Sequence, residues 1–112
     1  MIIYEVNLIV KQKIADDYAA WLPGHIREML ALPGFESAEW LSDEDFHEEE
    51  GADPRWTIHY RLASHDDFIR YAENDAERMR AEGIDRFGRN FEATRRILRV
   101  RDDFERVPRR EP

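Results

Sequence analysis

The sequence contains no cysteine, and this absence removes several kinds of chemistry at once. Without a thiol, the chain forms no disulfide bond, holds no metal through thiolates and has no cysteine nucleophile, which is compatible with a reducing compartment. No apolar run approaches the roughly 20 residues of a membrane-spanning helix, and the first ten residues carry neither the basic segment nor the small-residue cleavage site of an export signal. We therefore expect a cytoplasmic protein that does not contact membranes.

Motifs for nucleotide and hydrolase chemistry are missing as well. There is no Gly-x-Ser-x-Gly elbow, no Walker loop and no dinucleotide fingerprint, and we expect no cofactor. The net charge of −8 disfavours nucleic acid as a partner. The acidic run between Asp43 and Asp53 lacks the central glycine and the terminal glutamate spacing of a calcium loop. We interpret it as a solvated hairpin tip and expect no metal site.

What the sequence does contain is a clear succession of strands and helices. The opening "MIIYEVNLIV" alternates as a strand, and apolar side chains then recur at three- and four-residue spacing from residues 14 to 31, as in an amphipathic helix. Pro23 and Gly24 fall inside that pattern. A proline in a helix interior removes one backbone hydrogen bond and clashes with the preceding turn, so we expect a kink near Leu22.

The second half of the chain shows the same kinds of strand and helix pattern. "FESAEWL" and "RWTIHYRL" alternate as two strands of a hairpin, and Ser64 with Asp67 forms a capping box that starts a second helix. We expect Gly83 to interrupt this helix and Gly88 to end it, and "NFEATRRILRV" to form the last strand.

The order β-α-β-β-α-β predicts a ferredoxin-like α+β fold, in which a four-stranded antiparallel sheet carries both helices on one face. The first and third strands lie in its centre. We assign residues 1–101 to this single domain. Residues 102–112 contain too little apolar surface to pack, and we expect them to be a mostly disordered tail.

Strand alternation predicts a polar cluster on the sheet face away from the helices. Two helices cover only one face, and the side chains expected on the other face come from both central strands and the last strand. The polar ones are Glu5, Asn7, Thr57, His59, Arg61 and Arg95, with Ile3, Ile9 and Ile97 among them.

Three interpretations of this polar face remain open. It is a water-exposed sheet surface, or it packs on a second copy of the chain, or it forms a ligand or catalytic site in which Glu5 holds His59 as an acid or base. In the second case Glu5 needs a partner such as Arg61 or Arg95, because an unpaired buried charge is strongly destabilising. The face lacks the aromatic rings and the basic signature of RNA-recognition domains.

Several segments resemble a family of small bacterial proteins of unknown function in the dimeric α+β barrel superfamily. They are "MIIYEVNL", "AAWLPGHIREMLALPGF", "HYRLASHDDFIRYAENDAERMRAEGIDRFG" and "FEATRRIL". The resemblance implies the fold and a homodimer, and it supplies no activity. Some haem-degrading members of the superfamily have residues that Asn7, Trp56 and His65 match superficially. Alternation sends Asn7 and Trp56 to opposite faces, which argues against haem chemistry.

These observations favour a dimeric module that binds a small molecule or a protein partner without catalysis. The alternative, from a different class, is a cofactor-independent enzyme of the monooxygenase or isomerase type that uses His59 and Glu5. The sequence gives no direct indication of the ligand.

Overall fold

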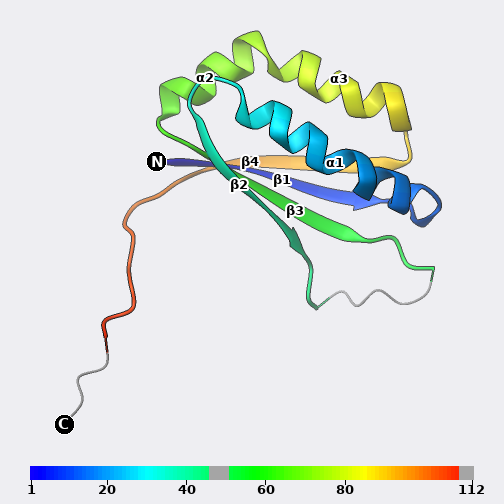
Figure 1. Ribbon diagram of the computed structural model, residues 1–112, viewed down its shortest axis with the longest axis horizontal. Coiled ribbons are helices and arrows are strands. Elements are labelled where there is room, and N and C mark those ends of the chain that lie inside the picture. The colour runs from blue at the N-terminus through cyan, green and yellow to red at the C-terminus, as the bar shows by residue number, and fades with distance from the viewer. Residues whose placement is uncertain (46–50, 109–112) are drawn as a thin grey trace.

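The computed structural model describes residues 1–45 and 51–108 (Figure 1). Its strands and helices follow the predicted order, with a short 3-10 helix, η1, before the first α-helix. The elements are β1 (Ile2–Val10), η1 (Gln12–Ile14), α1 (Ala15–Leu30), β2 (Phe35–Ser42), β3 (Arg55–Leu62), α2 (His65–Asn74), α3 (Ala76–Phe87) and β4 (Phe91–Arg99).

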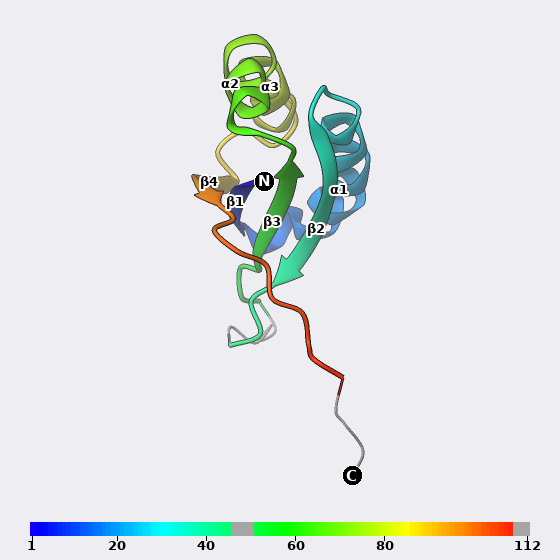
Figure 2. The ribbon, with the colours of Figure 1, turned by 90° about the vertical axis from the view of Figure 1, so that its left-hand side faces the viewer.

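The four strands form one antiparallel sheet in the order β2-β3-β1-β4. The helices all lie on the same side of it, so the molecule has one helical layer and one sheet layer (Figures 1 and 2). This arrangement confirms the ferredoxin-like α+β fold with β1 and β3 in the centre. Alternate residues of those two strands point into the helical layer, where Tyr4, Leu8, Ile58 and Tyr60 are buried.

Helix α1 runs without a break from Ala15 to Leu30 although Pro23 lies inside it. The apolar stripe explains this continuity, because Tyr18, Leu22 and Met29 are all buried against the sheet. Burial of such side chains stabilises by about 1.5–3 kcal/mol each, which offsets the lost hydrogen bond at the proline.

The predicted second helix is divided at a different residue from the one expected. The prediction placed the interruption at Gly83, whereas the structure places it at Asp75, whose φ of −127° leaves the helical region between α2 and α3. Gly83 is buried within α3, where a Cβ atom would stand 3.4 Å from both Phe91 and Trp21. A side-chain methyl group would therefore fit there in ordinary van der Waals contact, and the glycine does not end the helix. The predicted cap at Ser64 is confirmed, since its Oγ accepts from the Asp67 backbone N–H at 3.2 Å.

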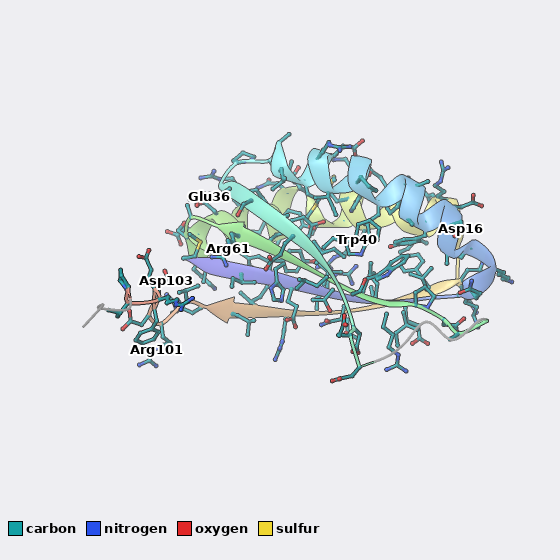
Figure 3. All side chains as sticks on the ribbon, turned by 60° about the horizontal axis from the view of Figure 1, so that its bottom comes forward. Asp16, Glu36, Trp40, Arg61, Arg101 and Asp103 are labelled. Atoms are coloured by element: carbon teal, nitrogen blue, oxygen red, sulfur yellow. The ribbon has the colours of Figure 1, made fainter. Side chains whose placement is uncertain are left out.

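The chain leaves the sheet after β4 and extends away from the two layers (Figure 1). The Val100 N–H donates to the Met1 carbonyl at 3.0 Å, and the following residues to Pro108 have no regular secondary structure. The side chains of Arg101 and Asp103 lie on this tail, beyond the end of the sheet (Figure 3).

The predicted disorder of residues 102–112 stays a prediction, and the last four of these residues lie outside the described part. Residues 46–50 of the predicted hairpin tip also lie outside the described part. Within the described part, no helix is long and apolar enough to cross a membrane.

Candidate functional site

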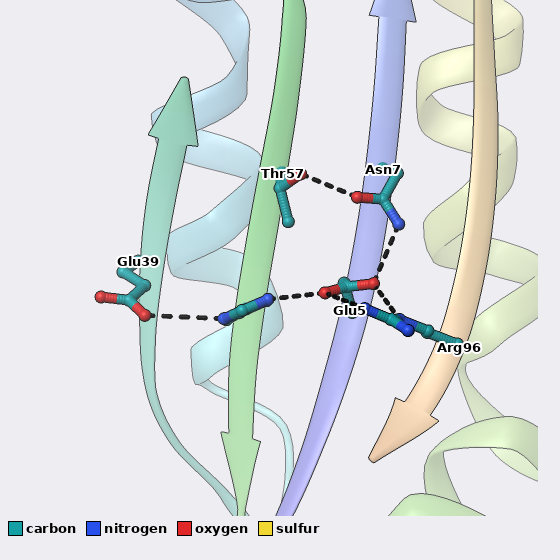
Figure 4. A network of polar contacts seen from close by, with 6 residues as sticks. Glu5, Asn7, Glu39, Thr57 and Arg96 are labelled. Atoms are coloured by element: carbon teal, nitrogen blue, oxygen red, sulfur yellow. Dashed lines mark hydrogen bonds and ion pairs between the residues drawn. The ribbon is translucent and has the colours of Figure 1, made fainter. Parts of the chain in front are cut away.

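The polar cluster on the sheet face opposite the helices, here called the open face, is built around Glu5. Strand pairing places Glu5 opposite His59 of β3 and Arg96 of β4, and Asn7 opposite Thr57 (Figure 4). The predicted grouping of Glu5, Asn7, Thr57 and His59 on one face thus agrees with the strand register. Whether any of them acts in binding or catalysis stays a prediction.

The Glu5 carboxylate has donors on both of its oxygens. Asn7 Nδ2 donates to Oε2 at 3.0 Å, His59 Nε2 lies 2.8 Å from Oε1, and the Arg96 guanidinium donates to both oxygens. Glu5 is only 5% exposed, so these contacts replace water. The Arg96 hydrogen bond, assisted by Asn7 and His59, holds the pKa of Glu5 at about 2 against the opposing effect of burial. The carboxylate is therefore ionised at neutral pH.

Further contacts extend this network across the sheet (Figure 4). Thr57 Oγ1 donates to Asn7 Oδ1 at 2.7 Å, which orients the amide so that its Nδ2 reaches Glu5. On the other side, His59 Nδ1 lies 3.6 Å from Glu39 Oε1 on β2. The His59 ring therefore bridges two carboxylates, and all four strands contribute to one chain of polar contacts.

The position predicted for Arg95 is wrong. Arg95 pairs with Val6, and both side chains point to the helical layer, together with Ile97 opposite Tyr4. Arg96 is the residue that meets Glu5. Arg61 does lie on the open face, opposite Ile3, but it is exposed and makes no ion pair in the described part of the chain. Alternation alone could not separate Arg95 from Arg96, because polar residues occupy three successive positions, Thr94 to Arg96.

A cavity of about 720 Å³ lies on the opposite side of the sheet, between the strands and the helices α1 and α3. Aromatic and aliphatic side chains from both layers form its walls. The aromatic residues that line it are Tyr4, Tyr18, Trp21, Tyr60, Tyr71 and Phe91. A volume of this size is in the ordinary range for small-molecule sites, which are concave and mostly apolar. The sequence did not predict this cavity, since its lining residues come from separate strands and helices.

Charged residues are also part of the cavity lining. Arg80, Arg89 and Arg95 line it, against a single carboxylate, Glu92, so positive charge is in excess. Arg80 Nη2 donates to the Tyr4 hydroxyl at 3.2 Å. Neither Arg80 nor Arg95 forms an ion pair with a carboxylate among the described residues. These two guanidinium groups therefore retain donors for another acceptor.

Three tyrosines of the cavity, Tyr18, Tyr60 and Tyr71, are neutral at physiological pH. Burial raises the pKa of Tyr18 to about 12, and burial also raises the pKa of Tyr60 and of Tyr71. Their hydroxyl groups act as neutral hydrogen-bond donors and acceptors. These three tyrosines therefore supply no phenolate charge to balance the arginines in the cavity.

The predicted catalytic pair lies apart from this cavity. Neither Glu5 nor His59 lines it, and neither lines a smaller pocket of about 220 Å³ on the open face beside Asn7 and Thr57. Catalysis by His59 and Glu5 stays a prediction, and these two pockets give it no support. Three side chains that could together ligate a metal ion, His25, Glu28 and Glu82, lie elsewhere, on α1 and α3.

The sheet order and the single helical layer define an α+β protein of the ferredoxin-like type that dimeric α+β barrels share. Within that class, the chain belongs to the DUF4286 family, a domain of unknown function, whose family model matches residues 1–101. The resemblance to a bacterial family of unknown function is thereby confirmed. Comparison with the curated proteins finds no significant match.

Solved structures with the same fold include several oxygenase-type proteins. A provisionally assigned antibiotic biosynthesis monooxygenase from Deinococcus radiodurans superposes with a TM-score of 0.73 at 8% identity, covering 96% of this chain and 99% of that one. SnoaB from Streptomyces nogalater, a cofactor-independent oxygenase, gives 0.67 at 13% identity over 94% and 98%. A conserved protein from Methanosarcina mazei gives 0.64 at 15% identity over 88% and 92%. Similarity at these identities shows a shared fold.

Proposed function

We propose that this protein binds a small, flat, aromatic molecule that carries an anionic group, in the cavity between the sheet and helices α1 and α3. The observation that carries the proposal is the composition of the cavity wall. Six aromatic residues line a space of about 720 Å³ together with aliphatic ones, and Arg80 and Arg95 line it without carboxylate partners in the described part.

Each part of the wall favours a different part of such a ligand. Aromatic side chains bury large areas and stack on flat rings, which supplies affinity without requiring charge. A guanidinium group offers several N–H donors in a fixed plane that matches a carboxylate, and such charge-assisted hydrogen bonds are stronger than neutral ones. Because Tyr4 already holds Arg80, the guanidinium group needs little reordering when an anion binds.

The proposal includes a homodimer in which two open faces pack together. The open face mixes Ile3, Ile9 and Leu98 with the Glu5 network, and such a mixture suits an interface better than a fully solvated surface. Membership of a fold class known for dimeric barrels supports the same arrangement. In this dimer the two cavities face outward, one in each subunit, and remain accessible to ligands.

Titration with a matched pair of compounds tests the ligand proposal. 2-Naphthoate carries a carboxylate on a flat ring system, and 2-naphthamide has nearly the same shape without charge. Isothermal titration calorimetry measures the affinity for each compound. We expect 2-naphthoate to bind at least about tenfold more tightly, which corresponds to roughly 1.4 kcal/mol.

Arg80→Met and Arg95→Met should each reduce this preference, whereas Arg27→Met on the exposed side of α1 should leave it unchanged. Equal affinity for both compounds would contradict the proposal.

A second candidate is a cofactor-independent monooxygenase that works in the same cavity with dioxygen as the oxidant. The specific observation in its favour is the fold shared with SnoaB, described as a cofactor-independent oxygenase. The arginines would also favour the electron-rich phenolate form of a phenolic substrate. Oxygen uptake distinguishes the two candidates: binding alone consumes no dioxygen, whereas a monooxygenase consumes it in proportion to the substrate added.

A further inference from the structure

A second group of polar side chains lies where α1 and α3 approach each other, at the rim of the cavity. His25 and Glu28 are three residues apart on α1 and therefore lie on the same side of that helix, and Glu82 comes from α3. His25 Nδ1 is 3.1 Å from Glu82 Oε2. One ligand atom from each of the three side chains lies within 4.8 Å of the other two.

The surroundings hold the histidine in place and leave the carboxylates without a cation. The His25 ring stacks on Trp21 with centroids 4.6 Å apart and an interplanar angle of 24°, and its side chain is only 15% exposed. Glu82 is 34% exposed and Glu28 lies at the surface. In the part of the chain that the structure describes, neither Glu28 nor Glu82 forms an ion pair with lysine or arginine. Two negative charges thus converge on one imidazole.

We infer that His25, Glu28 and Glu82 bind one divalent transition-metal ion of the Zn²⁺ type. Zinc bonds to imidazole nitrogen and carboxylate oxygen are about 2.0–2.2 Å long, so ligand atoms of a tetrahedral site are about 3.3–3.6 Å apart. Small side-chain rotations of the two glutamates bring the three atoms from their present spacing to that geometry. Imidazole selects transition metals over Mg²⁺ and Ca²⁺, which prefer oxygen ligands alone.

Such an ion would link α1 to α3 across the rim of the cavity. Three protein ligands leave at least one coordination position for water or another molecule, as in metal sites that remain open. His25 also lines the cavity, so this site adjoins the proposed ligand space without sharing Arg80 or Arg95. The metal site does not depend on the proposed function, and either of the two can fail alone.

Calorimetric titration of the chelator-treated full chain with Zn²⁺ tests this inference. We expect one saturable site per chain and a rise in melting temperature with zinc, because an ion that binds only the folded state stabilises it. Glu28→Gln and Glu82→Gln should each lower zinc affinity by about tenfold or more, since losing even an outer-shell partner commonly has that effect. Glu73→Gln, on the exposed side of α2, is the matched control and should bind like the wild type.

Glu28 is at the surface, so its replacement leaves the fold intact even if Glu82→Gln destabilises the protein. Cobalt absorption bands that need His25 provide a second readout, because they report nitrogen coordination directly. Two results would overturn the inference. One is the absence of saturable binding at millimolar zinc. The other is unchanged affinity in Glu28→Gln, which would assign the zinc to acidic groups elsewhere.

Discussion

The Glu5 carboxylate shows how a single buried charge is accommodated on the open face. Its donors come from the neighbouring strands and from Asn7 on its own strand, and they supply enough hydrogen bonds to keep it ionised although it is buried. A buried carboxylate of this kind stabilises the fold only while it is charged. Stability should therefore depend on pH through this group.

The first prediction concerns the replacement Glu5→Gln. The folded-state pKa of Glu5, about 2, is lower than the usual 4.5, so its contribution to stability is complete above pH 4.5 and is lost as the pH falls towards 2. The shift corresponds to at most about 3 kcal/mol. Because the Arg96 side chain is 65% exposed and screened by water, we expect Glu5→Gln to destabilise by about 1–2 kcal/mol at pH 7. Urea unfolding of both proteins between pH 3 and 7 measures the difference.

Glu36→Gln provides the control for this measurement, because Glu36 is exposed on β2 and makes no contact of this kind among the described residues. Its effect on stability should be small at every pH. A Glu5→Gln effect that stays constant between pH 3 and 7 would show that the carboxylate charge does not stabilise the fold.

At the residue scale, the sequence predicted which polar side chains of the central strands β1 and β3 share the open face. It placed the wrong arginine of the edge strand β4 on that face. Glu5, Asn7, Thr57 and His59 lie on strands whose alternation of apolar and polar residues is strict, so their common face follows directly. On β4 the alternation of apolar and polar residues is weak. The sequence therefore does not show which of the adjacent residues Arg95 and Arg96 lies on the open face. The pairing of β4 with β1 places Arg96 opposite Glu5 on the open face.

At the scale of elements, two glycines of the α1 region have opposite roles. Gly24 lies inside α1, and a Cβ atom there would have nothing within 4 Å. Gly34 lies in the turn before β2 with φ of +84°, and a Cβ atom there would overlap the Asp67 side chain. Asp67 in turn bonds to the Ser64 cap of α2, so this turn lies against the start of another helix.

The second prediction is that Gly24→Ala stabilises the protein and Gly34→Ala destabilises it. Alanine is favoured over glycine in a helix interior by about 0.5–1 kcal/mol, which corresponds to a melting temperature about 3–5 °C higher. At Gly34 the left-handed backbone costs about 1–2 kcal/mol and the overlap adds to that. Calorimetry of the two variants measures both effects. A Gly34→Ala protein as stable as the wild type would contradict the described turn.

The order and type of the elements followed from the sequence, whereas the helix break at Asp75 did not. Gly83 has the stronger intrinsic tendency to interrupt a helix. It lies inside α3 all the same, buried near Trp21 and Phe91, and this tertiary environment is not revealed by the local sequence.

At the scale of the whole molecule, the third prediction is the homodimer. The chain has a mass of 13.4 kDa, and sedimentation at micromolar concentration should give twice that value. Leu98→Glu places a charge on the open face and should shift the population towards monomer. Ile69→Glu, on the exposed side of α2, should not. A wild-type chain that sediments at 13.4 kDa would contradict the proposed packing of open faces.

The cavity is the feature that could least be predicted, because it depends on the space between two layers. Its aromatic residues have the spacing of an ordinary core, and the cavity is the space left between the sheet and the helices that these residues line. No pattern along the chain encodes this space. The cavity is also the basis of the central claim, that an aromatic anion binds between the layers.

The fourth prediction tests that claim through the three methionines of the chain. Met29 and Met79 are buried and line the cavity, whereas Met1 is exposed at the N-terminus and does not line it. NMR spectra of ¹³C-methyl methionine during titration with 2-naphthoate report each site separately. Ring currents of a naphthalene bound in the cavity should shift the Met29 and Met79 signals in a saturable way and leave the Met1 signal in place. Unshifted Met29 and Met79 signals at saturating 2-naphthoate would contradict binding between the layers.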